Sequence, residues 1–207
     1  MSENPYTTFG EIRLSRRLIA DKLKDKDFDS VLEVGAQWGE NLVWIRDKIA
    51  TKALRLVGVD TDIDTTNEAK KITGLDLQIG NVLNLEFDNK EFDVVCTNAL
   101  FCMLEPSQVE QGLIEVMRVA KKYVILVELE TKEDVGFVFG GRTGANWEKL
   151  FSKYGLKVTK EKILPEIWNA TPWIDFGYTY VVELGEKRFC DQCDSKGKRH
   201  KLGCPKR

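Results

Sequence analysis

The sequence predicts an α/β domain in which helices cover both faces of a mostly parallel β-sheet. Short apolar segments of strand length alternate along the chain with segments of helical pattern, as in successive strand–helix–strand units. The chain has 207 residues, enough for one such domain with a small appendage. Hydrophobic residues make up 43% of the chain and charged residues 31%, which is typical of a globular protein with a sizeable core.

Strands are expected where short runs rich in Val, Leu and Ile lie between polar or glycine-containing segments. These runs cover residues 30–35, 54–60, 75–80, 92–98 and 122–130. Helices are expected at residues 40–50, 67–74, 107–122 and 145–155. Two later strand-like segments, 156–164 and 177–184, favour a final strand pair. In such a sheet, ligands bind beyond the carboxyl ends of the strands, near the point where the strand order reverses.

The overall charge gives no sign of a polyanionic partner. Lys and Arg total 31 against 33 Asp and Glu, a formal net charge of −2 at pH 7. No apolar run reaches the roughly 18–20 residues that span a bilayer. Residues 1–17 contain no apolar core of a secretory signal. We therefore expect a cytoplasmic protein that makes no membrane contact.

A glycine-containing loop, VLEVGAQWGEN at residues 31–41, joins the first predicted strand to the first predicted helix. Gly35 and Gly39 allow the backbone to turn sharply and to approach a ligand without an intervening Cβ. Asp60 ends the second strand, where an acidic side chain can accept both hydroxyls of a ribose. Singly, the glycines fit ordinary turns and Asp60 fits a helix cap. Their order and spacing favour a nucleoside site.

The segment EVGAQWGEN resembles the E-x-G-x-G-x-G loop of the class I S-adenosylmethionine-dependent methyltransferases. LVGVDTD at 56–62 and the stretch 77–104 are similar to the following motifs of that family in order and spacing. The resemblance covers about residues 25–185. It implies a Rossmann-like, seven-stranded, mostly parallel sheet with an antiparallel last strand. It also favours S-adenosyl-L-methionine over a dehydrogenase-type nucleotide as the ligand of the loop.

The resemblance further implies which residues hold this cofactor. Glu33 is expected to order the methionyl end, Asp60 to bind the ribose and Asn81 to meet the adenine. The full set of expected contacts is Glu33, Gly35, Ala36, Gly39, Asp60, Thr61, Asn81, Val82 and Thr97. The chain departs from the family pattern where Gln37 replaces the middle glycine of the loop and where Asn81 replaces a common Asp. These departures bear on the affinity for the cofactor more than on the assignment to the family.

The residues after the fourth strand bear on the methyl acceptor. Enzymes that methylate amino groups of DNA carry an Asn/Asp-Pro-Pro-aromatic tetrad there, whereas residues 97–101 read TNALF. Residues 97–104 instead resemble the same region of small-molecule methyltransferases, with Cys102 in place of a frequent His. Cys102 is more readily explained as a packing residue than as a nucleophile.

Two later segments are expected to contribute to an acceptor site. Residues 138–147 form a glycine-rich stretch that we interpret as a lid, in which Arg142 either clamps a carboxylate or phosphate or is simply solvated. Residues 166–178 are rich in aromatic side chains, which suit a sugar, a flat ring or a base, or else pack on the sheet. Glu166 and Asp175 are the only carboxylates of that segment, and no catalytic residue is assigned.

The last 22 residues have a different composition. Residues 186–207 carry eight basic and three acidic side chains, a net charge of +5, which leaves −7 on residues 1–185. They also contain the pattern C-x2-C-x6-H-x3-C, whose members suit a structural zinc ion: Cys190, Cys193, His200 and Cys204. We divide the chain into a methyltransferase domain, 1–185, and a basic, zinc-knuckle-like tail, 186–207. Incidental cysteines in a basic tail are the alternative.

The leading function is therefore methyl transfer from S-adenosyl-L-methionine to a small-molecule or sugar-like acceptor. A second reading is an RNA or DNA methyltransferase recruited through the basic zinc tail, because zinc knuckles contact single strands through charge and stacking. A third is a non-catalytic protein that keeps the cofactor fold. The only His of the chain lies in the tail, so a general base in the domain has to be a carboxylate or Tyr.

Overall fold

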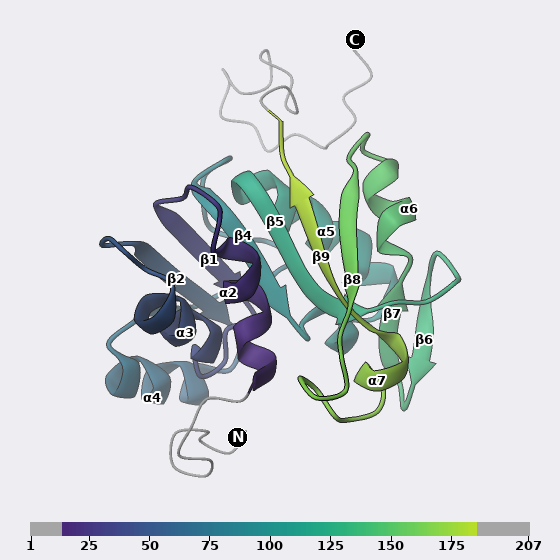
Figure 1. Ribbon diagram of the computed structural model, residues 1–207, viewed down its shortest axis with the longest axis horizontal. Helices are drawn as coiled ribbons and strands as arrows, with labels where there is room; N and C mark the ends of the chain where they lie inside the picture. The colour runs from purple at the N-terminus through teal and green to yellow at the C-terminus, as the bar shows by residue number, and fades with distance from the viewer. Residues whose placement is uncertain (1–13, 186–207) are drawn as a thin grey trace.

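A computed structural model describes residues 14–185, and its centre is a seven-stranded sheet in the order β3-β2-β1-β4-β5-β9-β8 (Figure 1). The strands are β1 (Ser30–Val34), β2 (Arg55–Asp60), β3 (Asp76–Ile79), β4 (Phe92–Asn98), β5 (Ala120–Leu129), β8 (Val158–Lys162) and β9 (Gly177–Glu183). Strands β1 to β5 pair in parallel, and β9 runs antiparallel to both β5 and β8. The five predicted strands, the final pair and the Rossmann-like sheet are confirmed.

Helices lie on both faces of the sheet, as predicted (Figure 1). They are α2 (Arg17–Leu23), α3 (Glu40–Lys48), α4 (Ile63–Thr73), α5 (Pro106–Val119), α6 (Trp147–Ser152) and α7 (Trp173–Phe176), with short 3-10 turns η1 (Leu14–Arg16) and η2 (Phe101–Met103). The two faces form separate cores, since α2 and α3 pack into one and α5 and α6 into the other. Successive side chains of β4 alternate between them from Val94 on: Val94 and Cys96 belong to the first core and Val95 to the second. A register shift between Phe92 and Val94 places Phe92 in the second core as well.

Several helix boundaries differ from the prediction, most clearly those of α4 and α5. Helix α4 begins at Ile63, four residues before the expected start, because the Asp62 side chain caps it by accepting from the Thr65 amide at 3.0 Å. Helix α5 ends at Val119 and β5 begins at the next residue, so the expected helix 107–122 extended too far. Helices α2 and α7 were not predicted.

The expectation of a glycine-rich loop at residues 138–147 was wrong, and the role of this segment as a lid stays a prediction. The segment is largely a β-hairpin, formed by β6 (Val135–Phe139) and β7 (Arg142–Ala145). Gly140 and Gly141 form its two-residue turn, with positive φ angles of 54° and 74°. Both angles are those of a type I′ turn, which suits the twist of a hairpin and favours glycine.

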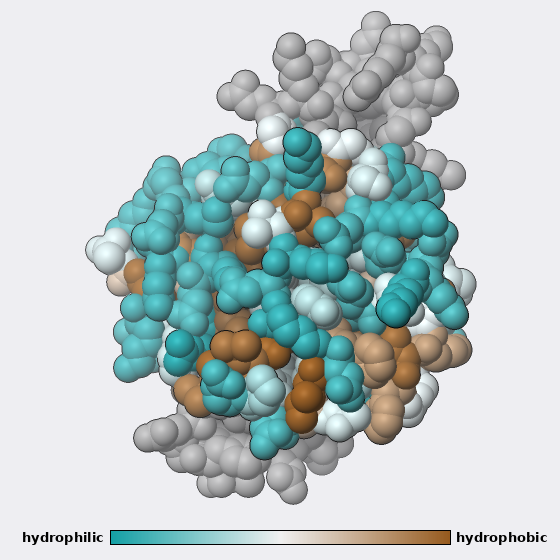
Figure 2. All heavy atoms as spheres, turned by 45° about the vertical axis from the view of Figure 1, so that its right-hand side comes forward, coloured by the Kyte–Doolittle hydropathy of each residue, from teal (hydrophilic) through white to brown (hydrophobic). Residues whose placement is uncertain are grey.

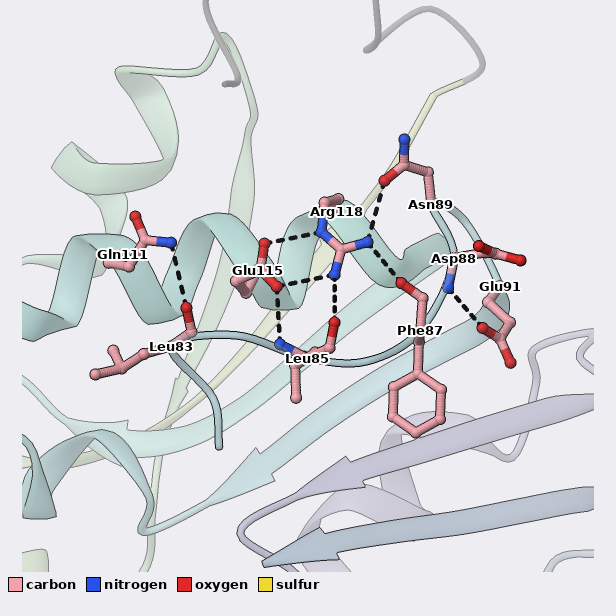
Figure 3. A network of polar contacts seen from close by, with 9 residues as sticks. All are labelled: Leu83, Leu85, Phe87, Asp88, Asn89, Glu91, Gln111, Glu115 and Arg118. Atoms are coloured by element: carbon pink, nitrogen blue, oxygen red, sulfur yellow. Dashed lines mark hydrogen bonds and ion pairs between the residues drawn. The ribbon is translucent and has the colours of Figure 1, made fainter. Parts of the chain in front are cut away.

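A buried arginine fixes the segment between β3 and β4 onto α5 (Figure 3). The Arg118 guanidinium donates to both Glu115 carboxylate oxygens at 2.8 Å and to the carbonyls of Leu85 and Phe87 at 2.8 and 2.7 Å. It also donates to Asn89 Oδ1 at 3.1 Å. Arg118 and Glu115 are only 4% and 6% exposed, so this network replaces the water that both charges lose.

Within residues 14–185, no helix combines the length and the apolar content that a membrane crossing requires.

Candidate active site

A pocket of about 720 Å³ lies at the carboxyl ends of the parallel strands. Its lining comes from Arg16, Gly35, Gln37 and Leu129, and from residues within the segments 60–62, 98–103, 139–142 and 168–173. Strand β1 pairs with β2 on one side and with β4 on the other, so the strand order reverses here. The pocket therefore lies where the sequence predicts ligand binding in an open α/β sheet.

The glycine loop after β1 contains three residues in the left-handed region: Gly35 at φ 78°, Gln37 at φ 45° and Gly39 at φ 71°. The amides of Gly35 and Ala36 donate to the Val59 carbonyl at 2.8 and 3.0 Å, which ties the loop to β2. A Cβ on Gly35 would lie 3.0 Å from the Leu100 Cδ1, so only glycine fits here without strain. Gln37 adopts a conformation that costs a non-glycine residue about 1 kcal/mol or more.

Asp60 is held in a fixed orientation at the end of β2. Its Oδ2 accepts from the Gln37 amide at 2.9 Å, and its Oδ1 accepts from the Asp62 amide at 3.0 Å. Each carboxylate oxygen keeps further acceptor capacity, and the residue lines the pocket. Although the loop departs from the family pattern at Gln37, the backbone amide of this residue still orients Asp60, the side chain predicted to bind a ribose.

A chain of buried amides connects the pocket to Glu33. The Asn98 Nδ2 donates to Asn41 Oδ1 at 3.1 Å, and the Asn41 Nδ2 donates to Glu33 Oε1 at 2.5 Å. Burial raises the pKa of Glu33 to about 8, although the hydrogen bond from Asn41 favours the ionised form. Neither Glu33 Oε2 nor Asn98 Oδ1 accepts a hydrogen bond from any residue in the range 14–185.

The free Asn98 Oδ1 provides a test of fit for S-adenosylmethionine. Buried acceptors are normally satisfied, so an unsatisfied one beside a pocket indicates a missing donor. Asn98 lines the pocket, and its Oδ1 suits the ammonium of a methionyl group. Together with the Asp60 carboxylate and the open backbone at Gly35, it gives the chemistry that this cofactor requires.

A second buried carboxylate, Glu128 near the end of β5, was not identified from the sequence. Its Oε1 accepts from the Thr97 hydroxyl at 2.8 Å and from the Leu100 amide at 2.9 Å. Burial raises its pKa to about 7, against the effect of the Thr97 hydroxyl and the amides of residues 100–102. Glu128 does not line the pocket itself, but it fixes the turn after β4, whose residues Asn98 to Leu100 do. An acidic residue in the apolar run VILVELE was the available signal.

The structure brings only some of the predicted cofactor residues to the pocket. Gly35, Asp60 and Thr61 line it, whereas Glu33 and Thr97 are buried behind it. Ala36 and Gly39 contribute loop backbone, with a 2.7 Å hydrogen bond between them. Asn81 and Val82 lie outside the lining: Asn81 Oδ1 accepts from the Leu83 amide at 2.9 Å, and Val82 is buried in the core. Their contact with adenine stays a prediction.

The part of the lining opposite Asp60 combines aromatic and aliphatic side chains with one charged residue. Trp168 and Trp173 stack with ring centroids 3.9 Å apart and planes 9° apart, and both line the pocket together with Phe139, Met103 and Arg142. Glu166 and Asp175, the carboxylates considered from the sequence, are exposed and do not contribute to the lining.

Cys102 has the environment of a packing residue. It is 4% exposed and its Sγ donates to the Ala99 carbonyl at 3.3 Å. Burial, reinforced by the Glu128 charge, raises the pKa of its thiol to about 12. A thiol with such a pKa is not ionised at neutral pH and is a poor nucleophile.

No group of three or more potential metal ligands occurs among the residues from 14 to 185. The predicted zinc ligands Cys190, Cys193, His200 and Cys204 lie outside the described residues.

The sheet order, the glycine loop and the pocket at the reversal of strand order are those of the class I methyltransferase fold. Residues 31–123 match a protein family described as a methyltransferase domain. No curated protein matches the chain significantly in sequence.

Solved structures share this fold at low sequence identity. A chain from the complex between a methyltransferase activator and a methyltransferase of Haloferax volcanii gives a TM-score of 0.63 at 18% identity, over 86% of this chain and 91% of that chain. A protein from Pyrococcus horikoshii gives 0.59 at 17% identity, over 89% and 100%. Phosphoethanolamine N-methyltransferase 1 of Haemonchus contortus, solved with phosphoethanolamine and S-adenosylhomocysteine, gives 0.59 at 18%, over 87% and 45%.

Proposed function

We propose that the protein is an S-adenosylmethionine-dependent methyltransferase that acts on a small molecule. The observation that carries the proposal is the joint geometry of the glycine loop and Asp60. The Gln37 amide and the Asp62 amide orient the Asp60 carboxylate at the pocket wall, at the end of β2. The position suits the two hydroxyls of a ribose.

The residues around the loop have separable roles. Gly35 keeps the backbone accessible, Asp60 binds the ribose, and Asn98 Oδ1 accepts from the methionyl ammonium. Glu33 acts through Asn41, which holds the Asn98 amide in the orientation that leaves this oxygen free. When bound, S-adenosylmethionine supplies an electrophilic methyl group on a sulfonium.

The chain then has to align an acceptor and exclude water. Methyl transfer depends chiefly on alignment, and a base is needed only where the acceptor loses a proton. Glu128 positions the turn at residues 98–103 against which an acceptor would lie. The pocket volume of about 720 Å³ is in the range of small-molecule sites, and residues 97–101 lack the Pro-Pro tetrad of DNA amino-methyltransferases.

The proposal is tested by the release of S-adenosylhomocysteine from S-adenosylmethionine. The full-length protein is incubated with fractionated small metabolites or with total RNA, and Asp60→Ala serves as the inactive reference. Release with a small-molecule fraction supports the proposal. Release with RNA alone points to the nucleic-acid alternative, and S-adenosylhomocysteine binding without turnover on either pool points to a cofactor-binding protein.

We also propose that the segment 186–207 binds one structural zinc ion through Cys190, Cys193, His200 and Cys204. Support comes from the spacing of the four ligand types alone. Metal analysis of the protein purified under reducing conditions should find about one zinc per chain. Cys193→Ser should lower that content, whereas Cys96→Ser, a change in the domain, should not. If the wild-type protein contained no zinc, the segment would be a basic extension without a metal site.

A further inference from the structure

We infer that the methyl acceptor is a flat, ring-containing molecule that carries an anionic oxygen group, bound by Arg142 and by the stacked pair Trp168–Trp173. The inference rests on the proposed function, because it concerns the acceptor side of the same pocket. Arg142 and the Trp168–Trp173 pair would then determine which acceptors the enzyme accepts.

Arg142 is distinguished by its lack of a counter-ion. The other arginines between residues 14 and 185 all pair with a carboxylate: Arg16 with Glu40, Arg17 with Asp21, Arg46 with Asp47, Arg55 with Glu91 and Arg118 with Glu115. Arg142 has no carboxylate partner among the described residues, and its Nη1 lies against the Met103 sulfur instead. An exposed guanidinium in a pocket wall is suited to bidentate binding of a carboxylate or phosphate.

The remaining charges of the pocket already have partners within the protein. Asp60 accepts two backbone amides, and Asp62 caps α4 through the Thr65 amide and hydroxyl. Arg16 is paired with Glu40 at 3.2 Å. Asp60 ends β2, whereas Arg142 begins β7 in the hairpin that comes after β5; β2 and β5 are separated in the sheet by β1 and β4. The pocket is therefore divided into an acidic part, which suits the ribose, and a basic part that is left for a second, anionic ligand.

The surroundings of Arg142 favour a planar ring. Trp173 is 7% exposed, whereas its stacking partner Trp168 is only partly buried and presents the more accessible ring. Met103 and Phe139 also line the pocket and are 65% and 51% exposed. Figure 2 shows apolar side chains gathered in the lower half of the view, the part of the molecule that holds α7 and the β6–β7 hairpin in Figure 1. A ring stacked on Trp168 would cover part of this apolar surface.

The test uses benzoate, phenyl phosphate and the neutral isostere benzamide as probes. Their binding to the full-length protein saturated with S-adenosylhomocysteine is followed by tryptophan fluorescence, after calorimetry has established that S-adenosylhomocysteine binds. We expect at least one of the two anions to bind about tenfold or more tightly than benzamide. Arg142→Ala should weaken that anion about tenfold or more, Arg142→Lys should restore part of the loss, and Arg17→Ala should have no effect. Trp168→Ala should weaken anions and benzamide alike.

The outcomes separate this inference from the proposed function. If S-adenosylhomocysteine does not bind, the proposed function fails and the inference falls with it. If S-adenosylhomocysteine binds with the same affinity to wild type and Arg142→Ala, the cofactor site is intact in the variant. The affinities for benzoate and phenyl phosphate then test the inference. Equal binding of benzamide and both anions, no binding of any probe, or no response to Arg142→Ala would overturn the inference while leaving the cofactor site in place. A preference for benzoate or for phenyl phosphate identifies the anion.

Discussion

Two buried polar networks lie in this domain, and they differ in how completely they are satisfied. In the network between α5 and the segment 83–91, all five N–H groups of Arg118 have an acceptor (Figure 3). In the network Glu33–Asn41–Asn98 at the pocket, Glu33 Oε2 and Asn98 Oδ1 accept nothing from residues 14–185. The first arrangement stabilises the fold, whereas the second leaves Asn98 Oδ1 without a donor beside the pocket, at some cost in stability.

The largest effect expected from this comparison follows from removing the arginine of the satisfied network. Arg118→Ala leaves the buried Glu115 carboxylate and the carbonyls of Leu85 and Phe87 without their donors, which should lower the free energy of unfolding by about 3–5 kcal/mol. Urea denaturation measures this loss. Arg17→Ala, which removes a partly exposed pair with Asp21, should cost about 0.5 kcal/mol or less. Similar losses in the two variants would show that the buried network does not stabilise the domain.

The second prediction concerns the pH dependence that the pocket network imposes. The pKa of Glu33 is about 8 in the folded protein and near 4.5 in the unfolded chain, so the folded state holds the proton over this interval. Stability contributed by this group is therefore lost as the pH rises from about 4.5 to 8. Relative to Glu33→Gln, the wild type should become less stable by an amount on the order of 2–3 kcal/mol between about pH 5 and pH 8.

Denaturation of both proteins across this pH range gives the difference directly, because the remaining titratable groups are common to both. A difference that stays constant with pH would show that Glu33 does not titrate in this interval.

A smaller effect is expected when the free acceptor itself is removed. Asn98→Leu keeps the shape of the side chain but removes Oδ1, so S-adenosylhomocysteine should bind about tenfold more weakly, while the free energy of unfolding should fall by only about 1 kcal/mol. Calorimetry and urea denaturation measure the two quantities. Unchanged affinity would mean that Asn98 does not face the cofactor.

The smallest effect is expected at the strained position of the glycine loop. Gln37→Gly relieves the left-handed strain but increases the conformational entropy of the unfolded chain, so the free energy of unfolding should change by less than about 1 kcal/mol. The amide that donates to Asp60 is retained, and the affinity for S-adenosylhomocysteine should not fall. Gln37→Ala, which keeps the strain and removes the side-chain amide, is the matched control. A drop in affinity in both variants would assign a binding role to the Gln37 side chain.

The features of the molecule that the sequence predicted are those encoded in local patterns. The apolar runs identified the strands, and the spacing of Gly35, Gly39 and Asp60 identified the place of the pocket. The β6–β7 hairpin was missed although its Gly140-Gly141 pair is a known hairpin signal, because the flanking strands are short and half exposed.

The polar networks required the tertiary structure. Glu33, Asn41 and Asn98 come from β1, α3 and β4, and no local pattern indicates that their side chains meet. Glu128 gave a local signal, a carboxylate in an apolar strand, but its partners Thr97 and Leu100 lie about 30 residues away. The lack of a carboxylate beside Arg142 likewise depends on the positions of residues that are distant in the sequence, among them Met103.

A calorimetric titration of the full-length protein with S-adenosylhomocysteine shows directly whether this pocket binds the cofactor. The wild type should bind one equivalent, with a dissociation constant in about the micromolar range. Asp60→Ala should bind about tenfold or more weakly, and Asp76→Ala, which removes an exposed carboxylate of β3, should bind like the wild type. No heat of binding in the wild type, or equal affinity in wild type and Asp60→Ala, would contradict the assignment of this pocket as the cofactor site.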